Sequence, residues 1–255
     1  MKAANTALVT GASKGVGRGI ALGLAAAGWD VAVNYNADKE GAEQTAAAIR
    51  DAGGRSWVLQ GNVGLSKDVM AMFEQLDQLA GPLGLLVNNA GVQTWSSLLE
   101  LKEADWDRVI DTNLKGTFLC TQQAAIRMKA HGLGGSIINI GSGANKRPFP
   151  GLVDYTASKG GIDQFTQVAA VELGPEKIRV NCVAPGAIEI ERTKLEADDY
   201  AGTWGPITPM RRIGYPEDVA KAVVFLAGPD AEFITGQTVY VDGGLLTQAP
   251  WPYAG

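Results

Sequence analysis

Short apolar runs alternate with helix-length amphipathic segments along the whole chain. The apolar runs are expected to form strands and lie at residues 7–9, 31–33, 57–59, 85–87, 137–140, 180–183 and 238–241. The amphipathic segments between them lie near residues 15–27, 39–52, 66–79, 103–131, 152–174 and 216–227. The runs are nearly continuous in apolar character, as expected for parallel strands that helices cover on both faces. This alternation predicts right-handed crossovers and an open, doubly wound α/β sheet.

The chain is expected to form one domain. No low-complexity linker or repeat interrupts its 255 residues, of which 46% are hydrophobic. We therefore expect a single Rossmann-type domain over residues 1–255, built on a mostly seven-stranded parallel sheet flanked by helices. The exception to the rhythm is segment 185–209, which is rich in Glu, Asp, Gly and Pro. Irregular segments of that length usually cover binding sites, so we expect a substrate lid around residues 188–209.

Composition argues against several classes of partner. The formal net charge is −5, which disfavours a nucleic-acid surface because such surfaces need clustered Lys and Arg. Cys120 and Cys182 lack metal-ligand spacing and no His/Cys cluster occurs, so we expect no metal and a reduced, cytoplasmic protein. A secretory signal and an apolar stretch of membrane-spanning length are both missing, so no membrane partner is expected.

A cluster of glycines follows the first predicted strand. It reads Thr10-Gly11-Ala12-Ser13-Lys14-Gly15-Val16-Gly17 and opens a predicted helix. Such glycines permit a tight turn and close approach to a pyrophosphate, while the helix N-terminus offers free N–H groups. The spacing differs from the common dinucleotide fingerprint, so a merely crowded strand–helix turn is the alternative. The position directly after the first strand favours dinucleotide binding.

The end of the second predicted strand indicates which dinucleotide is bound. NAD enzymes usually carry a carboxylate there, which accepts a hydrogen bond from the ribose 2′-OH. Here the strand ends Val33-Asn34-Tyr35-Asn36, without an acid. Lys14 and Arg18 lie in and just after the glycine turn, where a cation would attract a 2′-phosphate. We therefore expect NADP(H), with NAD(H) as the second cofactor to consider; the alternative is that both cations are solvated charges at a helix start.

A tyrosine and a lysine form a candidate acid–base pair. The run Tyr155-Thr156-Ala157-Ser158-Lys159 places them four residues apart at the start of a predicted helix, hence on one face. A free tyrosine titrates near ~10 and is a poor base at neutral pH, but a neighbouring ammonium stabilises the phenolate. Such a pair can also donate a proton to a developing alkoxide. Taken alone, an exposed Tyr and Lys one turn apart are the commoner explanation.

Two more polar residues strengthen this interpretation. Ser142 follows the predicted strand 137–140, at the carboxyl edge of the sheet, where its hydroxyl could hydrogen-bond a carbonyl oxygen. A turn-forming serine between two glycines is the alternative. Asn113 lies inside a long helical segment, where Asn is mildly unfavourable. A helix bend or a water-binding role would explain Asn113, and simple surface placement is the alternative.

Together these motifs resemble the classical short-chain dehydrogenase/reductase family over essentially the whole chain. The glycine turn, Asn88-Asn89-Ala90-Gly91, Asn113, Ser142, Tyr155-x-x-x-Lys159 and Pro185-Gly186 occur in the family's order and at family-like spacing. The glucose 1-dehydrogenase and 3-oxoacyl-carrier-protein reductase type is the most similar. The resemblance implies hydride transfer between NADP(H) and a carbonyl or secondary alcohol of a small ketone, sugar, polyol or 3-oxoacyl substrate. A catalytically idle protein that senses NADP is the alternative, and loss of Tyr155, Lys159 or Ser142 would have favoured it.

The resemblance also implies a role for each residue. Tyr155 would be the general acid/base, Lys159 would support the phenolate and hold the nicotinamide ribose, Ser142 would orient the carbonyl, and Asn113 would anchor a water. The residues implied to bind the cofactor are Gly11, Ser13, Lys14, Gly15, Val16, Gly17, Arg18, Asn34, Tyr35, Asn36, Asn62, Val63, Asn89, Ala90, Gly91, Tyr155, Lys159, Pro185, Gly186 and Ile188. The residues expected to line the substrate are Gln93, Trp95, Ser142, Gly143, Asn145 and Glu191.

The sequence departs from the family pattern at two positions. Asn62 stands where the family often has an Asp that contacts adenine, and Ile190 stands where it often has a Thr that touches the carboxamide. Thr193 could substitute for that Thr. Members of this type are usually homotetramers, with the last strand and the Tyr-bearing helix near subunit contacts, so a homotetramer is expected. We also hypothesise that the apolar run Trp251-Pro252-Tyr253 packs at a subunit interface or closes a neighbouring pocket.

Overall fold

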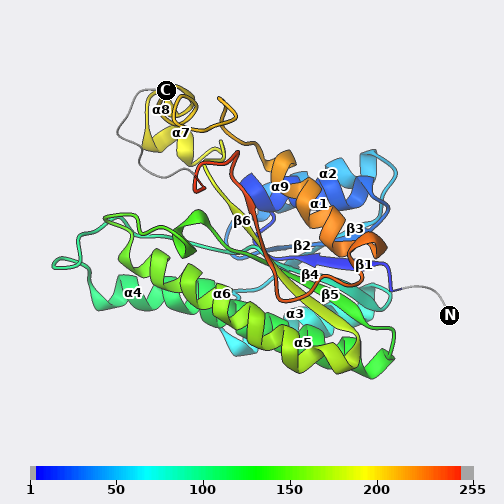
Figure 1. Ribbon diagram of the computed structural model, residues 1–255. Helices are drawn as coiled ribbons and strands as arrows, with labels where there is room; N and C mark the ends of the chain where they lie inside the picture. Colours follow the sequence, from blue (N-terminus) through cyan, green and yellow to red (C-terminus); the bar gives the residue numbers. More distant parts are fainter. Residues whose placement is uncertain (1–3, 248–255) are drawn as a thin grey trace.

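A single parallel sheet organises the molecule. The computed structural model describes residues 4–247, except for the side chains of residues 195 and 196. Trp251-Pro252-Tyr253 lies outside the described residues. The seven expected strands all form and are arranged in the order β3-β2-β1-β4-β5-β6-β7, each parallel to its neighbours (Figure 1). The prediction of a doubly wound α/β sheet is confirmed.

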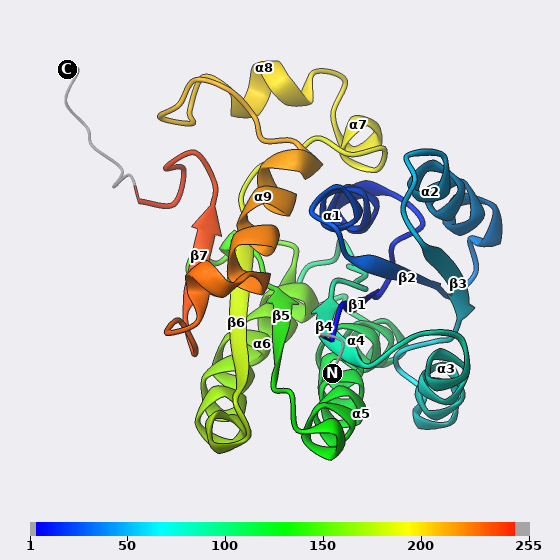
Figure 2. The same ribbon diagram turned by 90° about the vertical axis from the view of Figure 1, so that its right-hand side faces the viewer.

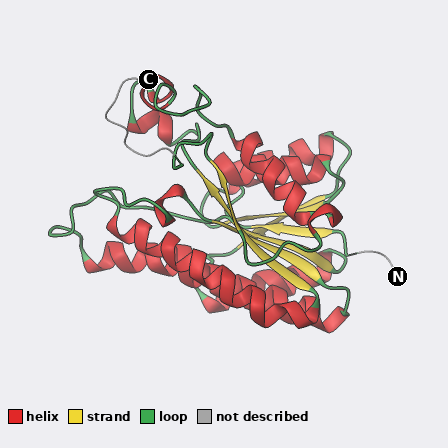
Figure 3. Cartoon of the chain, in the orientation of Figure 1, coloured by secondary structure: helices red, strands yellow, loops and turns green. Residues whose placement is uncertain are grey.

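The elements agree with the sequence pattern to within a few residues (Figure 3). The strands are β1 Thr6–Val9, β2 Asp30–Tyr35, β3 Ser56–Gln60, β4 Leu83–Asn88, β5 Gly135–Ile140, β6 Ile178–Pro185 and β7 Thr238–Val241. The α-helices are α1 Gly15–Ala26, α2 Lys39–Asp51, α3 Ser66–Leu79, α4 Glu103–Ile110, α5 Gly116–His131, α6 Val153–Leu173, α7 Thr193–Glu196, α8 Tyr200–Trp204 and α9 Pro216–Ala227. Shorter helical turns are η1 Asp111–Lys115, η2 Gly143–Asn145, η3 Gly174–Glu176 and η4 Pro229–Ala231.

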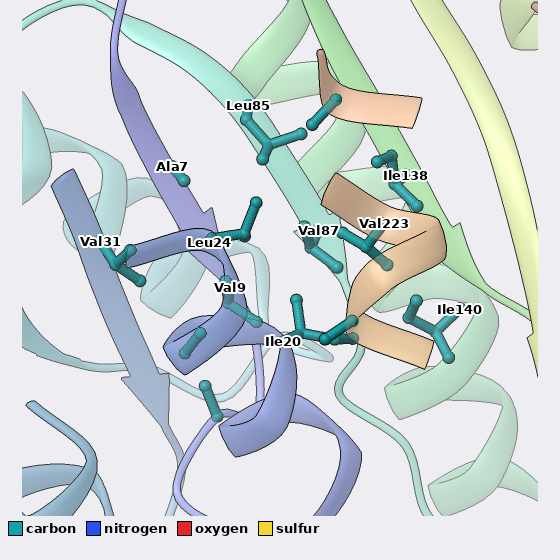
Figure 4. Packing of buried hydrophobic residues seen from close by; sticks show 14 of the residues in the cluster. Ala7, Val9, Ile20, Leu24, Val31, Leu85, Val87, Ile138, Ile140 and Val223 are labelled. Atoms are coloured by element: carbon teal, nitrogen blue, oxygen red, sulfur yellow. The ribbon is translucent and has the colours of Figure 1, made fainter. Parts of the chain in front are cut away.

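Helices cover both faces of the sheet. Figure 2 shows α1, α2 and α9 on one face and α3, α5 and α6 on the other, and each face has its own cluster of buried apolar side chains. On the first face, Ile20 of α1 and Val223 of α9 lie over Val87 of β4 (Figure 4). Because both faces are buried, the strands carry the continuous apolar runs seen in the sequence.

The strand order reverses next to β1. The chain builds β2 and β3 on one side of β1 and then crosses to β4, so that β5, β6 and β7 extend on the other side. In open sheets of this kind, ligands bind in the crevice outside the carboxyl ends of the strands at the reversal. The glycine turn follows β1 and Asn88-Asn89-Ala90-Gly91 includes the end of β4, so the sequence motifs meet at this point.

The long helical segment 103–131 is interrupted by a π-helical turn at the position of Asn113. A single π-helical turn, η1, separates α4 from α5. Such turns are rare and occur frequently at functional sites. The Asn113 side chain is fully buried there, so the alternative of simple surface placement is wrong.

The expected lid segment contains two short helices. Both α7 and α8 stand above the upper ends of β6 and α9 in Figure 2. The segment is anchored at its ends: a parallel bridge pairs Ile188 with Gly214, and the Met210 N–H donates to the Gly243 carbonyl at 3.2 Å. Closure of this segment over a substrate stays a prediction. Among residues 4–247, no helix has both the length and the apolar character needed to cross a bilayer.

Buried amides join β4 and β5 to the helices beneath them. The Asn88 amide donates to the Asn139 side-chain oxygen and to the Thr121 hydroxyl, at 2.9 Å in each case. Asn139 in turn donates to the Thr166 hydroxyl at 2.9 Å. Each of the four side chains is 5% exposed or less, so none of these hydrogen bonds can be replaced by bulk water.

Replacing Asn139 with alanine should therefore destabilise the fold. We expect Asn139→Ala to lower the free energy of unfolding by about 2–3 kcal/mol, because Asn88 and Thr166 each lose a buried partner. Urea unfolding followed by circular dichroism measures this value. The control Gln78→Ala removes an exposed amide from α3 and should change the value by less than about 0.5 kcal/mol. Equal effects of the two substitutions would contradict the prediction.

Candidate active site

The glycine turn leaves the N-terminus of α1 open to an anion. Gly11 and Gly15 adopt φ values of 61° and 56°, which favour glycine. The N-cap of α1 is Lys14, which makes no side-chain cap bond, and the first turn carries no acidic residue. The first N–H groups of the helix are therefore available, and the helix dipole adds a favourable potential for a phosphate group.

A side-chain amide locks this turn onto β4. Asn89 Nδ2 donates to the carbonyls of Thr10 and Gly11, at 2.9 and 3.0 Å. In return, the Thr10 hydroxyl accepts from the backbone N–H groups of Asn89 and Ala90, at 2.9 and 3.0 Å. Asn89 and Ala90, predicted to bind the cofactor, thus lie against the turn. The sequence motifs gave no role for Thr10. Its position between the first strand and the first glycine of the turn is the sequence feature that indicates one.

The end of β2 supports the turn from below. Asn34 is 1% exposed, and its side-chain oxygen accepts from the Gly11 N–H at 3.1 Å. Its amide nitrogen donates to the carbonyls of Leu59 and Gly61, at 3.2 and 3.1 Å. Tyr35 is also buried, at 6% exposure. Three residues at this strand end were predicted to bind the cofactor. Asn36 is exposed, whereas Asn34 and Tyr35 are buried within the protein.

Positive charge lies beside the turn, as expected. Lys14 is largely exposed, and its Nζ is 3.9 Å from Asp38 Oδ2. Arg18 follows one turn later in α1 and is half-buried. Asp38 is engaged as the N-cap of α2, where it accepts from the Gly41 N–H at 3.0 Å. Exposed ion pairs of this length contribute little to stability, so Lys14 is available to an incoming phosphate.

The residues after β3 form a short turn at the same edge of the sheet. The Asn62 side-chain oxygen accepts from the Gly64 N–H at 3.0 Å, and its backbone N–H donates to Asp68 at 3.2 Å. Val63 is buried next to Gly116, the first residue of α5. Asn62 and Val63 are thereby fixed near the carboxyl end of β3, where a contact to adenine was predicted.

Tyr155 and Lys159 face each other at the start of α6. The Lys159 Nζ lies 5.5 Å from the centre of the Tyr155 ring. Lys159 is 4% exposed, and its Nζ donates to the Ile140 carbonyl at 2.7 Å, at the end of β5. The predicted one-turn spacing therefore gives a buried ammonium beside a half-buried phenol, held in place by the last residue of a central strand.

The Asn113 side chain joins three segments. Its oxygen accepts from the Val92 N–H at 2.8 Å, and its nitrogen donates to the Val92 carbonyl at 2.9 Å. The same nitrogen donates to the Ser158 hydroxyl at 3.0 Å, and that hydroxyl donates to the Tyr155 carbonyl at 2.7 Å. Asn113 thus connects the loop after β4 to the first turn of α6. Ser158 was not among the predicted site residues, although its place within the Tyr–Lys run was a signal for it.

Gly91 brings the cofactor loop close to this cluster. A Cβ built on Gly91 would lie 3.4 Å from Asn113 Oδ1 and 3.8 Å from Lys159 Nζ. The loop after β4, the π-helical turn and α6 therefore converge within a few ångströms. Four of the predicted residues, namely Gly91, Asn113, Tyr155 and Lys159, are brought together.

Ser142 lies two residues beyond the carbonyl that holds Lys159. It is the N-cap of the short turn η2, and its hydroxyl accepts from the Ala144 N–H at 3.2 Å. Because Ile140 contacts Lys159, the end of β5 places Ser142 on the same side of the sheet as the Tyr–Lys pair. The predicted catalytic residues thus come from adjacent elements at one edge of the sheet.

The residues predicted along the nicotinamide follow β6. The Gly186 N–H donates to the Val241 carbonyl at 3.0 Å, so this loop is tied to β7. Ile188 is buried, at 6% exposure. The Thr193 hydroxyl accepts from the Ile190 N–H at 2.9 Å and lies 3.3 Å from the Ile188 carbonyl. Thr193 therefore stabilises its own loop. Pro185 is the last residue of β6, so Pro185 and Gly186 lie at the carboxyl edge of the sheet.

The residues predicted to contact substrate occupy different positions. Trp95 is 61% exposed and its ring lies beside Gly151, just ahead of α6. The Gln93 carbonyl lies 3.4 Å from an Arg108 nitrogen of α4. Glu191 lies over the glycine turn, with Oε2 3.7 Å from the Cβ position of Gly15. The structure thus places Glu191 on the phosphate side of the crevice, whereas Trp95 stands near the Tyr155 helix.

The Asn145 side chain points toward α6 and β7. Asn145 Nδ2 lies 3.3 Å from Asp163 Oδ1, and its oxygen accepts from the Tyr240 hydroxyl at 3.1 Å. Gly143, which precedes it in η2, is covered by Leu246. The Asn145 amide is therefore engaged within the protein, next to the turn that carries Ser142.

The two cysteines, Cys120 and Cys182, are both buried. Cys182 is buried behind Gly141, and burial raises the pKa of its thiol to about 11. The Cys120 thiol is buried as well, and its pKa is raised to about 12 for the same reason. In the described part of the chain, no cluster of His, Cys, Asp or Glu has the arrangement of a metal site.

A dinucleotide-binding sheet that carries a Tyr–Lys pair at its carboxyl edge defines a class of nicotinamide-dependent oxidoreductases. Comparison with known proteins agrees. A family model described as enoyl-(acyl carrier protein) reductase matches residues 11–246. The 3-oxoacyl-[acyl-carrier-protein] reductase FabG of Staphylococcus aureus is 43% identical over 245 residues, which cover 96% of this chain and 99% of that protein.

Solved structures of similar proteins include two with a bound cofactor. A gluconate 5-dehydrogenase from Burkholderia cenocepacia, in complex with NADP and tartrate, has a TM-score of 0.90 and 32% identity, with 97% of each chain covered. The angucycline C-6 ketoreductase LanV with bound NADP has a TM-score of 0.89 and 35% identity, and 96% of this chain and 97% of that chain are covered.

The chain belongs to the classical short-chain dehydrogenase/reductase family, and its curated relatives include 3-oxoacyl-carrier-protein reductases. The predictions of an enzyme and of oxidoreductase activity on carbonyl or alcohol groups are confirmed at the level of the family.

Proposed function

We propose that this protein transfers hydride between NADP(H) and a carbonyl or secondary alcohol, with Tyr155 as the proton donor and acceptor. The observation that carries the proposal is the buried Lys159 ammonium, held by the Ile140 carbonyl at 2.7 Å with its Nζ 5.5 Å from the centre of the Tyr155 ring. We infer that the Tyr155 hydroxyl takes a proton from an alcohol and returns it to a developing alkoxide, next to the fixed Lys159 side chain.

The cofactor proposal rests on charge at the glycine turn. β2 ends without a carboxylate, and Lys14 stands at the N-terminus of α1. The two neighbours with bound NADP support the same cofactor for this chain. The turn would hold the pyrophosphate, Lys14 and Arg18 would hold the 2′-phosphate, and Pro185 and Gly186 would lie along the nicotinamide. When bound, the nicotinamide supplies or receives the hydride.

The remaining residues have supporting roles in this proposal. Ser142 hydrogen-bonds the carbonyl oxygen and places it near Tyr155. Asn113 fixes the loop after β4 against α6, through its bonds to Val92 and Ser158. A water near Asn113 would continue the proton path from Lys159 toward solvent.

For the substrate, we propose several chemical classes rather than one compound. The names of the similar proteins include a 3-oxoacyl-[acyl-carrier-protein] reductase, a gluconate 5-dehydrogenase and an angucycline C-6 ketoreductase. Ketones, sugars or polyols, and 3-oxoacyl compounds are therefore the classes to test, in a panel that includes β-keto esters and cyclic ketones. Segment 188–209 would close over the bound substrate. We also propose a cytoplasmic location, which the two free, buried cysteines support.

We further propose that the protein assembles as a homotetramer through the outer surface of α5 and α6. Phe118 and Ile126 of α5 and Val168 and Val171 of α6 are exposed apolar side chains, between 43% and 78% accessible. Together they form the apolar α5/α6 face, which is larger than isolated surface residues would explain. A second copy is its occupant, because α6 is also the Tyr-bearing helix expected near subunit contacts.

Tyr155→Phe tests the acid–base role. We expect kcat for the fastest carbonyl in the panel to fall about 10²–10⁴-fold, because the hydroxyl that carries the proton is removed. NADPH oxidation followed at 340 nm measures kcat, and NADPH fluorescence should show unchanged cofactor binding. The control Tyr215→Phe makes the same change at an exposed tyrosine before α9. Activity retained by Tyr155→Phe would refute the role and leave the alternative of an NADP-sensing protein without catalysis.

Lys14→Ala tests the cofactor preference. We expect the dissociation constant for NADPH to rise about 5- to 30-fold, equivalent to about 1–2 kcal/mol, while that for NADH changes little. The difference arises because Lys14 would contact the 2′-phosphate, which NADH lacks. Fluorescence titration measures both constants, with Lys221→Ala on exposed α9 surface as the control. An equal loss for both cofactors would contradict the assignment.

Val168→Glu tests the assembly. A charge in the centre of the apolar α5/α6 face should convert the tetramer into a smaller species, because an unpaired buried carboxylate is costly. Size-exclusion chromatography with light scattering measures the mass of each species. The control Met70→Glu introduces the same charge at an exposed position of α3 and should leave the mass unchanged. A monomeric wild-type protein at micromolar concentration would overturn the proposal.

A further inference from the structure

The turn that carries Ser142 is not fixed by its own hydrogen bonds. Within it, the Ser142 hydroxyl accepts from Ala144 and the Asn145 N–H donates to the Ser142 carbonyl at 3.1 Å. These bonds shape the turn but do not set its position relative to Tyr155. A hydroxyl that must orient a carbonyl needs that position to be defined, since a misplacement of ~1 Å can cost roughly 10²-fold in rate.

The Gly141 N–H anchors the start of the turn by donating to the Val183 carbonyl of β6 at 2.8 Å, and the Asn145 side chain adds a second attachment at its other end. This side chain donates to Asp163 Oδ1 at 3.3 Å and accepts from the Tyr240 hydroxyl at 3.1 Å. Asp163 lies on α6, eight residues and about 12 Å along the helix from Tyr155, since each residue rises about 1.5 Å. Tyr240 lies on β7, the edge strand. The turn is therefore tied both to the helix that bears the acid–base and to the outer end of the sheet.

The two partners of Asn145 are themselves held in place. The Thr238 hydroxyl donates to the same Asp163 oxygen, and Lys146 Nζ stands 5.0 Å from the centre of the Tyr240 ring. Burial and the nearby Asp163 carboxylate raise the pKa of Tyr240, so its hydroxyl stays protonated and donates to Asn145. Thr238, Asp163, Asn145 and Tyr240 are thus connected in that order by side-chain hydrogen bonds, and we call them the Asp163 network.

We propose that the Asp163 network positions Ser142, and that Asp163, Asn145 and Tyr240 are positioning residues for the reaction. The inference rests on the role proposed above for Ser142. One rigid helix would then carry both the acid–base at position 155 and the carboxylate that fixes the Ser142 turn relative to it. Asn145 acts through Ser142 in this account and does not need to touch the substrate, as the sequence had suggested it would.

The inference separates two explanations for Asn145. A direct substrate contact requires only the Asn145 amide, so removal of the Tyr240 hydroxyl should matter little. A positioning role requires the whole network, so removal of either partner should affect the reaction. Cofactor binding should change little in either case, because Asp163, Asn145 and Tyr240 are not among the residues proposed to bind the cofactor.

Three variants test the network. Tyr240→Phe removes one hydrogen bond and keeps the ring, Asp163→Ala removes the acceptor, and Asp163→Asn keeps an oxygen in the same place. With the fastest carbonyl of the panel, we expect kcat/KM to fall roughly tenfold for Tyr240→Phe and more for Asp163→Ala. Asp163→Asn should recover most of the loss, and the dissociation constant for NADPH should stay within twofold of wild type. Asp230→Asn, at an exposed position of η4, is the matched control.

A double-mutant cycle with Ser142→Ala gives the decisive measurement. If the network acts through Ser142, adding Tyr240→Phe to Ser142→Ala should cause no further loss of kcat/KM. Additive losses, or full activity of both Tyr240→Phe and Asp163→Ala, would overturn the inference while leaving Ser142 its role. Full activity of Ser142→Ala would overturn the proposed role of Ser142 and the inference with it. Tyr240→Phe keeps the test valid if Asp163→Ala fails to fold.

Discussion

The arrangement of the candidate active site depends on the burial of the Lys159 ammonium. A buried ammonium without partners would be strongly destabilising, so the fold must supply acceptors at fixed positions. The Ile140 carbonyl at the end of β5 and the face of the Tyr155 ring meet that need. Because the same interaction joins a central strand to α6, it also decides where the phenol stands. The placement of the phenol beside the ammonium is thus a consequence of satisfying a buried charge.

Buried amides make this edge of the sheet rigid. Where parallel strands end, backbone groups lose their partners in the sheet and must find others. Asn34, Asn89 and Asn113 each accept from or donate to the backbone of a neighbouring loop, and each joins segments at least 21 residues apart in the chain. An amide suits this position because it both donates and accepts. The loops at this edge are therefore held in place by buried or half-buried side-chain amides.

The sequence was sufficient for the fold and for the identity of the main motifs. Alternation of apolar runs and helical segments predicted the sheet, and the Tyr155–Lys159 spacing predicted that the two side chains share one face of a helix. It could not show which way a polar side chain turns. Asn34 and Asn145 are in motifs that pointed to ligands, yet their amides bond within the protein. The partners of Asn145 are 18 and 95 residues away, so their contact depends on the packed tertiary structure rather than on any local pattern.

The residues proposed for proton transfer and the residues proposed to contact the substrate are held in different ways. Tyr155, Lys159 and Asn113 are fixed by bonds to β5, to the loop after β4 and within α6. By contrast, Trp95 and Glu191 are exposed and belong to loops at the mouth of the crevice. Loops on a rigid scaffold can change without loss of the framework beneath them. Similar proteins with nearly the same backbone bear names as different as a gluconate 5-dehydrogenase and an angucycline ketoreductase. Such variety is expected if the residues proposed for proton transfer are held by the sheet and the substrate meets mainly the loops.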